Sequence, residues 1–189
     1  MTQTTSVSSA DLVLRKIEAQ AENIFLPIIG PQKGRYLAEE VRKTRPRRVL
    51  EVGTLIGYSA ILMGKEMPPD SELVTIEIHR DEAKQAGDNI VKANIPAHVK
   101  ILTGNALEVI PTLEGTFDFV FIDAEKSEYL QYLKLAEPKL HAGTVVFADN
   151  AGVFADQMAD YLRYVRSGGG YESRYIQVGG DGVEISRKL

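Results

Sequence analysis

The feature that most constrains the fold is the stretch 49–60, which reads VLEVGTLIGYSA. It begins as a short, mostly apolar run, the pattern of a strand covered on both faces. Gly53 and Gly57 then bracket a loop that can approach a ligand closely, because neither residue has a Cβ atom. A helical pattern opens at Tyr58. In a doubly wound α/β sheet, a nucleotide-like ligand binds at such a turn beyond the first strand. A pair of glycines alone also fits any tight strand-to-helix turn.

An acid at the end of the next predicted strand, 73–77, narrows the ligand class. Glu77 follows Gly53 at close to the ~20-residue spacing at which an acid meets ribose hydroxyls in such folds. The spacing suits both a dinucleotide and S-adenosylmethionine. However, Leu55 stands where a pyrophosphate loop needs its middle glycine, and Glu51 would repel phosphate. Because Glu51 suits the cationic amino-acid end of a sulfonium ligand, the loop favours S-adenosylmethionine over a dinucleotide.

Composition excludes several classes of protein. With 189 residues and 44% hydrophobic residues, the chain predicts one globular domain over 1–189. It has no apolar run near the ~18 residues of a membrane span, and its polar start, 1–11, lacks a signal-peptide pattern. Without cysteine it has no disulfide, thiol nucleophile or thiolate metal site. A net charge of −4 argues against a general nucleic-acid binder. We therefore expect a cytoplasmic protein with no membrane partner.

Strand and helix patterns alternate along the rest of the chain. Further strands are expected over 99–102, 117–123 and 144–150, and a C-terminal hairpin over 171–178 and 182–186. Helices are expected over 9–23, 32–44, 80–93, 107–113, 126–140 and 153–166. This order predicts a doubly wound, mostly parallel sheet with helices on both faces and a C-terminal antiparallel hairpin. The most apolar strand, 117–123, belongs at the centre. The proline-broken segment 25–31 closes the N-terminal part, 1–30, and is either a lid or wall of the ligand site or a packed connector.

Oxygen-bearing side chains end two neighbouring predicted strands. Asp123 ends one strand, and Asp149 and Asn150 end the next. The carboxyl ends of parallel strands lie side by side, on the edge that carries the Gly53 loop. Two carboxylates and an amide oxygen are the hard donors that Mg²⁺ binds in proteins. Lys126, three residues after Asp123, places a cation beside them. The alternative is that these residues only cap the helices that follow.

These motifs together resemble the cation-dependent small-molecule O-methyltransferases, and among them catechol O-methyltransferase most. The resemblance covers nearly the whole chain from about Gly30. It is carried by Lys33-Gly34, the 49–60 stretch, Pro68-Pro69, 75–78, Gly104, Ile110-Pro111, 118–123, Lys126, Tyr129-Leu130, Gly143-Thr144, 148–150 and Asp181-Gly182. The metal triplet with its lysine is the specific part, whereas the glycine loop alone is common to class I methyltransferases.

The resemblance implies a Rossmann-like class I methyltransferase, and it implies which residues bind the cofactor, the metal and the acceptor proton. The methionine part of S-adenosylmethionine would lie on Glu51, Gly53, Tyr58 and Ser59, and its ribose on Glu77. Its adenine would lie along Gly104, Asn105 and Ala106, with Ile29, Ile78 and Asp123 as further cofactor contacts. Asn105 is also a candidate helix cap, and the two roles can coexist. Asp123, Asp149 and Asn150 would ligate Mg²⁺ or another oxygen-seeking cation. Lys126 would be the general base for a small aromatic acceptor with a vicinal diol.

The chain also departs from that family. Glu125 stands before Lys126 where the family has an aromatic wall, and the chain has no tryptophan. The stretch from Tyr175 to Asp181 is shorter than in the catechol enzyme, and no acid clearly matches the one used there on the second hydroxyl. These differences predict a more open acceptor site. Two alternatives remain, a methyltransferase that acts on RNA or protein through the basic 42–48 run and a non-catalytic cofactor-binding protein. A homodimer is also left open.

Overall fold

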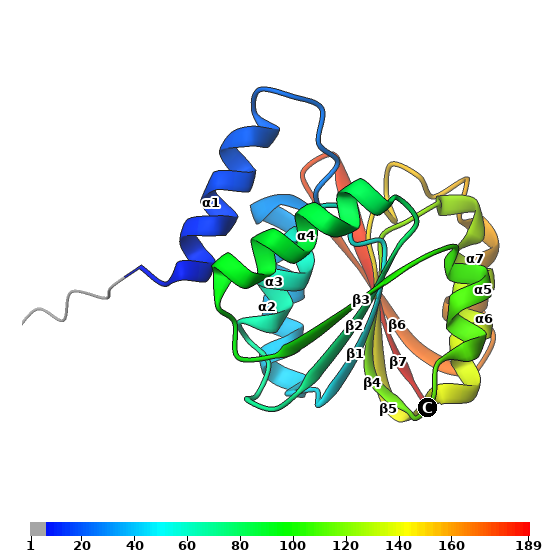
Figure 1. Ribbon diagram of the computed structural model, residues 1–189. Helices are drawn as coiled ribbons and strands as arrows, with labels where there is room; N and C mark the ends of the chain where they lie inside the picture. The colour runs from blue at the N-terminus through cyan, green and yellow to red at the C-terminus, as the bar shows by residue number, and fades with distance from the viewer. Residues whose placement is uncertain (1–6) are drawn as a thin grey trace, which may run out of the picture.

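The computed structural model describes residues 7–189 and contains a seven-stranded sheet in the order β3-β2-β1-β4-β5-β7-β6 (Figure 1). The strands are β1 Arg48–Val52, β2 Glu72–Glu77, β3 His98–Thr103, β4 Phe117–Ile122, β5 Leu140–Ala148, β6 Tyr171–Val178 and β7 Asp181–Lys188. Strands β1 to β5 pair in parallel, and β7 runs antiparallel to both β5 and β6. The predicted fold class is therefore confirmed, including the C-terminal hairpin and the central position of β4.

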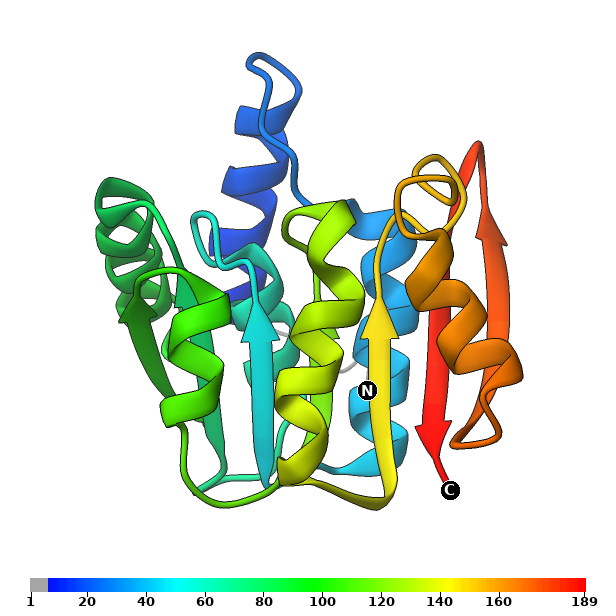
Figure 2. The same ribbon diagram turned by 90° about the vertical axis from the view of Figure 1, so that its right-hand side faces the viewer.

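Helices cover both faces of the sheet, which is seen edge-on in Figure 1 and from one face in Figure 2. One layer contains α1 Ser9–Ala21, α2 Gly30–Thr44, α3 Tyr58–Gly64 and α4 Arg80–Ala93. The other contains α5 Ala106–Thr112, α6 Tyr129–Ala136 and α7 Ala159–Ser167, with the short 3₁₀ turns η1 Lys126–Glu128 and η2 Glu137–Lys139 flanking α6. None of the helices within residues 7–189 is long and apolar enough to cross a bilayer.

The two faces of the sheet carry two separate hydrophobic cores, because successive strand residues point to opposite sides. On β4, Phe119 and Phe121 pack towards the layer of α2 and α3, whereas Val120 and Ile122 pack towards α5 and α6. All four are essentially inaccessible to solvent. A strand that is apolar on both faces is what a central parallel position requires.

The predicted helix over 153–166 is wrong in its first half. Residues 151–158 form turns, and the helix α7 begins only at Ala159. Within this segment Ala155 and Gln157 donate to carbonyls three residues earlier, those of Gly152 and Phe154, which is the bonding of successive turns. The amides of Gly152 and Val153 donate to the carboxylate of Asp181 at 3.2 and 2.9 Å, so the start of the segment is tied to the hairpin.

Other boundaries also differ from those predicted, and two of them concern the site. The helix expected over 126–140 is divided by its 3₁₀ turns, and the second contains Pro138, which has no N–H to donate to the preceding turn. The fifth strand ends at Ala148, so that Asp149 and Asn150 follow it. The prediction of one domain over 1–189 stays a prediction, and its first six residues lie outside the described part of the chain.

Candidate active site

Hydrogen bonds across the central strands place three strand ends side by side. The amide of Asp123 donates to the carbonyl of Val52 at 2.9 Å, and the amide of Asp149 donates to that of Ile122 at 3.1 Å. Gly53, the residue after Val52, therefore lies beside Asp123, which in turn lies beside Asp149. The sheet itself brings the predicted cofactor loop and the two predicted metal carboxylates to one edge.

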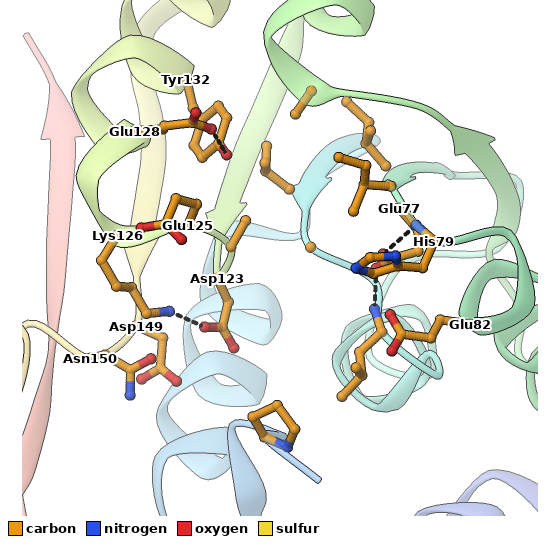
Figure 3. Close-up of a pocket in the computed structure, with 18 of the residues that line it drawn as sticks. Glu77, His79, Glu82, Asp123, Glu125, Lys126, Glu128, Tyr132, Asp149 and Asn150 are labelled. Carbon is orange, nitrogen blue, oxygen red and sulfur yellow. Dashed lines mark hydrogen bonds and ion pairs between the residues drawn. The ribbon is translucent and has the colours of Figure 1, made fainter.

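A cavity of about 850 Å³ opens along this edge (Figure 3). Its walls include side chains from the ends of β1, β2, β4 and β5, from η1, from the loop before α2 and from the turn after β5. The lining residues are Phe25, Pro27, Ile28, Val52, Gly53, Leu55, Ile76, Glu77, Ile78, His79, Glu82, Gly104, Asn105, Ala106, Asp123, Ala124, Glu125, Lys126, Glu128, Tyr132, Asp149, Asn150 and Phe154. The segment 25–31 thus supplies a wall of the cavity, as one of its two interpretations predicted.

Seven of the eleven predicted cofactor contacts line this cavity and four are not in its lining. Those in the lining are Gly53, Glu77, Ile78, Gly104, Asn105, Ala106 and Asp123. Ile29 is buried in the core. The Tyr58 hydroxyl donates to Glu18 at 2.6 Å. Ser59 donates to Glu51, whose side chain is fully buried. Direct contact of any of the eleven residues with a cofactor stays a prediction.

The glycine at position 53 is required by the backbone beside it. Gly53 has a φ of +98°, and a Cβ atom there would lie 2.2 Å from the carbonyl oxygen of Asp123. Any side chain would push β1 and β4 apart at the point where the strand ends meet. This glycine therefore maintains the alignment of the site as well as the openness of the loop.

The side chain of Glu77 holds the glycine loop in place. Its carboxylate accepts the amides of Thr54 at 3.2 Å, Leu55 at 2.7 Å and His79 at 2.9 Å. The carboxylate also lies in the cavity wall, with Glu82 and the His79 ring near it (Figure 3). One ligand atom from each of Glu77, His79 and Glu82 lies within 4.8 Å of the others. These three residues were not predicted to bind metal, and they lie on another wall of the cavity from Asp149.

Asn105 has the local role that its helix-cap interpretation predicted. Its side-chain oxygen accepts the amide of Leu107 at 2.9 Å and begins α5. The residue also lines the cavity. Capping and a place in the cavity wall thus coexist at this residue.

The predicted metal ligands face one another in the cavity (Figure 3). Burial, followed by the negative charge of Asp123, raises the pKa of Asp149 to about 7. The ammonium of Lys33 lies 2.7 Å from Asp149 Oδ1 and hydrogen-bonds Oδ2 at 2.8 Å. Oδ1, which is buried, makes no hydrogen bond within the described part of the chain. Two carboxylates that repel each other in a buried place form a site that favours a cation.

Lys126 lies on the same side of the cavity. Its Nζ donates to Asp123 Oδ1 at 2.8 Å and to the hydroxyl of Tyr129 at 2.9 Å. It also stands 5.9 Å from the centre of the Phe154 ring. The lysine is therefore held in one position against the predicted metal ligands, with an aromatic surface next to it.

Two charged residues of this region had no predicted role. Lys33, on α2, bridges Asp149 and Asp181, with a distance of 2.7 Å to Asp181 Oδ2. Lys33 and Asp181 are the two residues without a predicted role, and both were part of the motifs that carried the family resemblance. No local pattern assigns them to this site, because their contacts join segments more than 100 residues apart.

The basic run 42–48 lies at the opposite edge of the sheet from the cavity, because it ends where β1 begins. Arg42 pairs with Glu66 at 3.1 Å, and Arg48 pairs with Glu72 at 2.6 Å. Several of these cations are thus engaged in structural ion pairs away from the site.

Comparison with known proteins agrees with this geometry. The model of the O-methyltransferase family matches residues 3–162. The chain belongs to the O-methyltransferase family. Catechol O-methyltransferase B of Danio rerio is 37% identical over 156 residues, which cover 79% of this chain and 58% of that protein. Catechol O-methyltransferase of Niastella koreensis is 36% identical over 126 residues, covering 65% and 57%. The chain thus spans little more than half the length of these O-methyltransferases.

A solved O-methyltransferase structure confirms the Rossmann-like fold. The O-methyltransferase TomG from Streptomyces achromogenes, which is involved in tomaymycin synthesis and was determined in complex with S-adenosylmethionine, superposes with a TM-score of 0.85. The two sequences are 26% identical, and the superposition covers 100% of each chain. The whole architecture, including the terminal hairpin, is therefore that of an O-methyltransferase.

The buried Glu51 gives a prediction about stability. Burial raises the pKa of Glu51 from 4.5 to about 8, although the hydrogen bond that Ser59 donates to this carboxylate opposes the rise. The folded protein then holds a proton that the unfolded chain releases, so stability should fall as pH rises from about 5 to about 8. Glu51→Gln removes this loss and should raise the free energy of unfolding at pH 8 by roughly 3 kcal/mol or more. Urea unfolding of the ligand-free wild type and variant at several pH values measures this free energy of unfolding.

The control for this prediction is Glu172→Gln, at an exposed site on β6. This variant should keep the pH dependence of the wild type. Equal pH dependence in Glu51→Gln and the wild type would contradict the assignment of the proton to Glu51.

Proposed function

We propose that this protein is an S-adenosylmethionine-dependent and Mg²⁺-dependent O-methyltransferase whose acceptor is a small aromatic molecule with a vicinal diol. The observation that carries the proposal is that one cavity contains Glu77, the metal triplet Asp123, Asp149 and Asn150, and Lys126. Methyl transfer needs a methyl donor and an activated hydroxyl held close together. The two groups of residues supply these functions at opposite walls of that cavity.

The cofactor side rests on the loop after β1 and on Glu77. When bound, S-adenosylmethionine supplies an electrophilic methyl group on its sulfonium. Glu77 already orders the loop through the amides of Thr54 and Leu55 and still faces the cavity, where a carboxylate can accept hydroxyl hydrogen bonds. Asn105 and Ala106 line the cavity where the adenine is expected. The S-adenosylmethionine complex of TomG supports this side of the proposal.

The metal side fits the donor set of Mg²⁺. Asp123, Asp149 and Asn150 provide two carboxylates and an amide oxygen, and the buried Asp149 Oδ1 makes no hydrogen bond among the described residues, although the Lys33 ammonium lies 2.7 Å from it. Such a site leaves coordination positions for oxygens of the acceptor. When bound, Mg²⁺ would orient the diol and acidify its hydroxyl. The names of the catechol O-methyltransferases that resemble this chain support a diol acceptor.

Lys126 is placed to take the proton of the reacting hydroxyl. A lysine acts as a base in its neutral form, in which the amine has two N–H bonds and one lone pair. Asp123 and the Tyr129 hydroxyl accept from Nζ, so the two N–H bonds have partners and the lone pair is free for the proton. Burial raises the pKa of Tyr129 well above its ordinary value, which keeps this phenol protonated beside the amine. Asp123 and Tyr129 therefore aim the base.

The residues that line the cavity around Lys126 indicate which kind of acceptor fits. Phe154 offers an aromatic surface, and the carboxylate of Glu125 stands on the exposed side of the cavity. Phe25, 93% exposed, also belongs to the lining. A flat aromatic ring that keeps one edge in solvent fits such a site better than a large ligand that must be enclosed on all sides.

The alternative of an RNA or protein substrate is not favoured, because the basic run 42–48 lies at the far edge of the sheet. A cytoplasmic location stays a prediction.

The proposal is tested by incubating the protein with S-adenosylmethionine carrying a ¹³C-labelled methyl group, Mg²⁺ and a panel of catechols. Mass spectrometry should detect a labelled O-methyl product and S-adenosylhomocysteine, and excess chelator should abolish both. Matched monophenols, which offer one oxygen in place of two, should react far more slowly. Product formation that is unchanged in chelator would contradict the metal-dependent mechanism.

Replacing Glu77 tests the cofactor side. Glu77→Ala removes the expected ribose contacts and releases the loop amides, so S-adenosylhomocysteine should bind at least ~10-fold more weakly, as expected when charge-assisted hydrogen bonds are lost. The neighbouring Glu82→Ala, which removes an acid from the same wall, should change affinity by less than about 3-fold. Isothermal titration calorimetry measures both. Equal affinities of wild type and Glu77→Ala would refute the assignment.

Replacing Lys126 tests the base. Lys126→Ala should lower kcat by about 10²–10⁴-fold at neutral pH, the usual contribution of a positioned base. Cofactor affinity should be unchanged, and higher pH should restore part of the rate because a pre-ionised catechol no longer needs a base. The control is Lys134→Ala, an exposed lysine on α6. A pH–rate profile that is the same for wild type and Lys126→Ala would remove this lysine from the mechanism.

A further inference from the structure

We propose that Asp181, at the start of the hairpin strand β7, is a positioning residue that sets the orientation of the Asn150 amide in the metal site. The inference rests on the proposed metal site, but Asp181 is not one of its expected ligands. It is the first residue of β7, directly after the turn that joins β6 to β7, and lies outside the lining of the main cavity.

The contacts of Asp181 determine which atom Asn150 presents. The Asn150 side-chain nitrogen donates to Asp181 Oδ2 at 2.8 Å. A carboxylate only accepts hydrogen bonds, so the NH₂ end of the amide must face Asp181. The amide oxygen, which is the only atom of this side chain that ligates a cation, is then directed away from Asp181. The reversed amide would place two acceptors against each other.

Asp181 also fixes the backbone that carries Asn150. Its Oδ1 accepts the amides of Gly152 and Val153, in the turn directly after β5. Asn150 itself has a φ of +62°, a conformation that most L-residues avoid. Two amide hydrogen bonds next to this residue hold the turn closed, and a Cβ atom at Gly152 would lie 2.9 Å from the Asp181 carbonyl carbon. The hairpin is therefore packed directly against the turn.

Lys33 links this arrangement to Asp149. Its ammonium donates to Asp181 Oδ2 at 2.7 Å and to Asp149 Oδ2 at 2.8 Å. The side chain of Lys33 is 13% exposed to solvent and that of Asp149 is 2% exposed. Three segments far apart in the sequence, α2, the end of β5 and the start of β7, thus meet at the two predicted metal ligands. Side chains behind a metal site that orient its ligands typically change metal affinity 10–100-fold when they are replaced.

The substitution Asp181→Asn tests this role with little change in volume. An amide has one acceptor oxygen in place of two, so it cannot serve both the turn amides and the Lys33–Asn150 side. We expect the affinity for Mn²⁺, measured by the electron paramagnetic resonance signal of the free ion, to fall at least ~10-fold. Calorimetric affinity for S-adenosylhomocysteine should stay within about 2-fold, which shows that the variant is folded. Glu172→Gln, on the same hairpin, is the control for loss of a negative charge and should bind Mn²⁺ as the wild type does.

A double-mutant cycle separates orientation from charge. If Asp181 acts through Asn150, then Asp181→Asn should change Mn²⁺ affinity by less than about 3-fold in the Asn150→Ala background. An equal loss in both backgrounds would mean that only the charge of Asp181 matters and would overturn the inference. Wild-type affinity in Asp181→Asn would overturn it as well. Absence of Mn²⁺ binding by the wild type would instead contradict the metal site, and the inference with it.

A readout without metal completes the test. In the metal-free protein, the Asn150 side-chain amide gives an NMR cross-peak that is identified by its loss in Asn150→Ala. The hydrogen bond to Asp181 should slow the exchange of these protons with water, and Asp181→Asn should speed it. Unchanged exchange would show that Asp181 does not hold the amide.

Discussion

The parallel pairing of β1, β4 and β5 is the constraint on which the site depends. Asp123 and Asp149 each donate a backbone hydrogen bond to the neighbouring strand, so that their side chains leave the sheet next to each other and next to the Gly53 loop. A shift of one residue in either pairing would turn one carboxylate to the other face. The hydrophobic cores on both faces oppose such a shift. A shift would exchange Phe119 and Phe121 for Val120 and Ile122 between the two cores. Core packing therefore fixes the geometry of the chemistry.

The placement of charge follows from this geometry. Asp123 and Asp149 are held close together in a poorly hydrated place, which raises the pKa of Asp149. Two lysines from different segments, Lys33 and Lys126, offset part of this repulsion. Three carboxylates, with Asp181 as the third, face these two ammonium groups, and the imbalance suits a divalent cation. Although burial opposes it, the Lys33 contact and the backbone of Val153 hold the pKa of Asp181 below its ordinary value. The hairpin thus contributes a permanent negative charge behind the site.

Sequence reasoning reached the parts of this protein that local patterns encode. The glycine loop, the acid at the end of β2 and the acids after β4 and β5 follow from strand periodicity, and the structure brings Gly53, Glu77, Asp123, Asp149, Asn150 and Lys126 into one cavity. The Lys33–Asp149 bridge and the hydrogen bonds that tie the turn after β5 to Asp181 escaped it, because each depends on a partner far away in the chain. Glu51, on β1, and Ser59, on α3, are buried and are not in the lining of the cavity. Which face a strand residue takes can be predicted only once its neighbours are known.

The central claim is that the adjoining ends of β4 and β5 form the metal site of this cavity. It is tested most directly by anomalous diffraction from crystals grown with Mn²⁺ and S-adenosylhomocysteine. The account predicts one strong peak bounded by Asp123, Asp149 and Asn150, with Lys33 and Asp181 behind it. The cavity also holds a rival group of ligands, Glu77, His79 and Glu82. A peak at that group, or no peak at the ends of β4 and β5, would contradict the account.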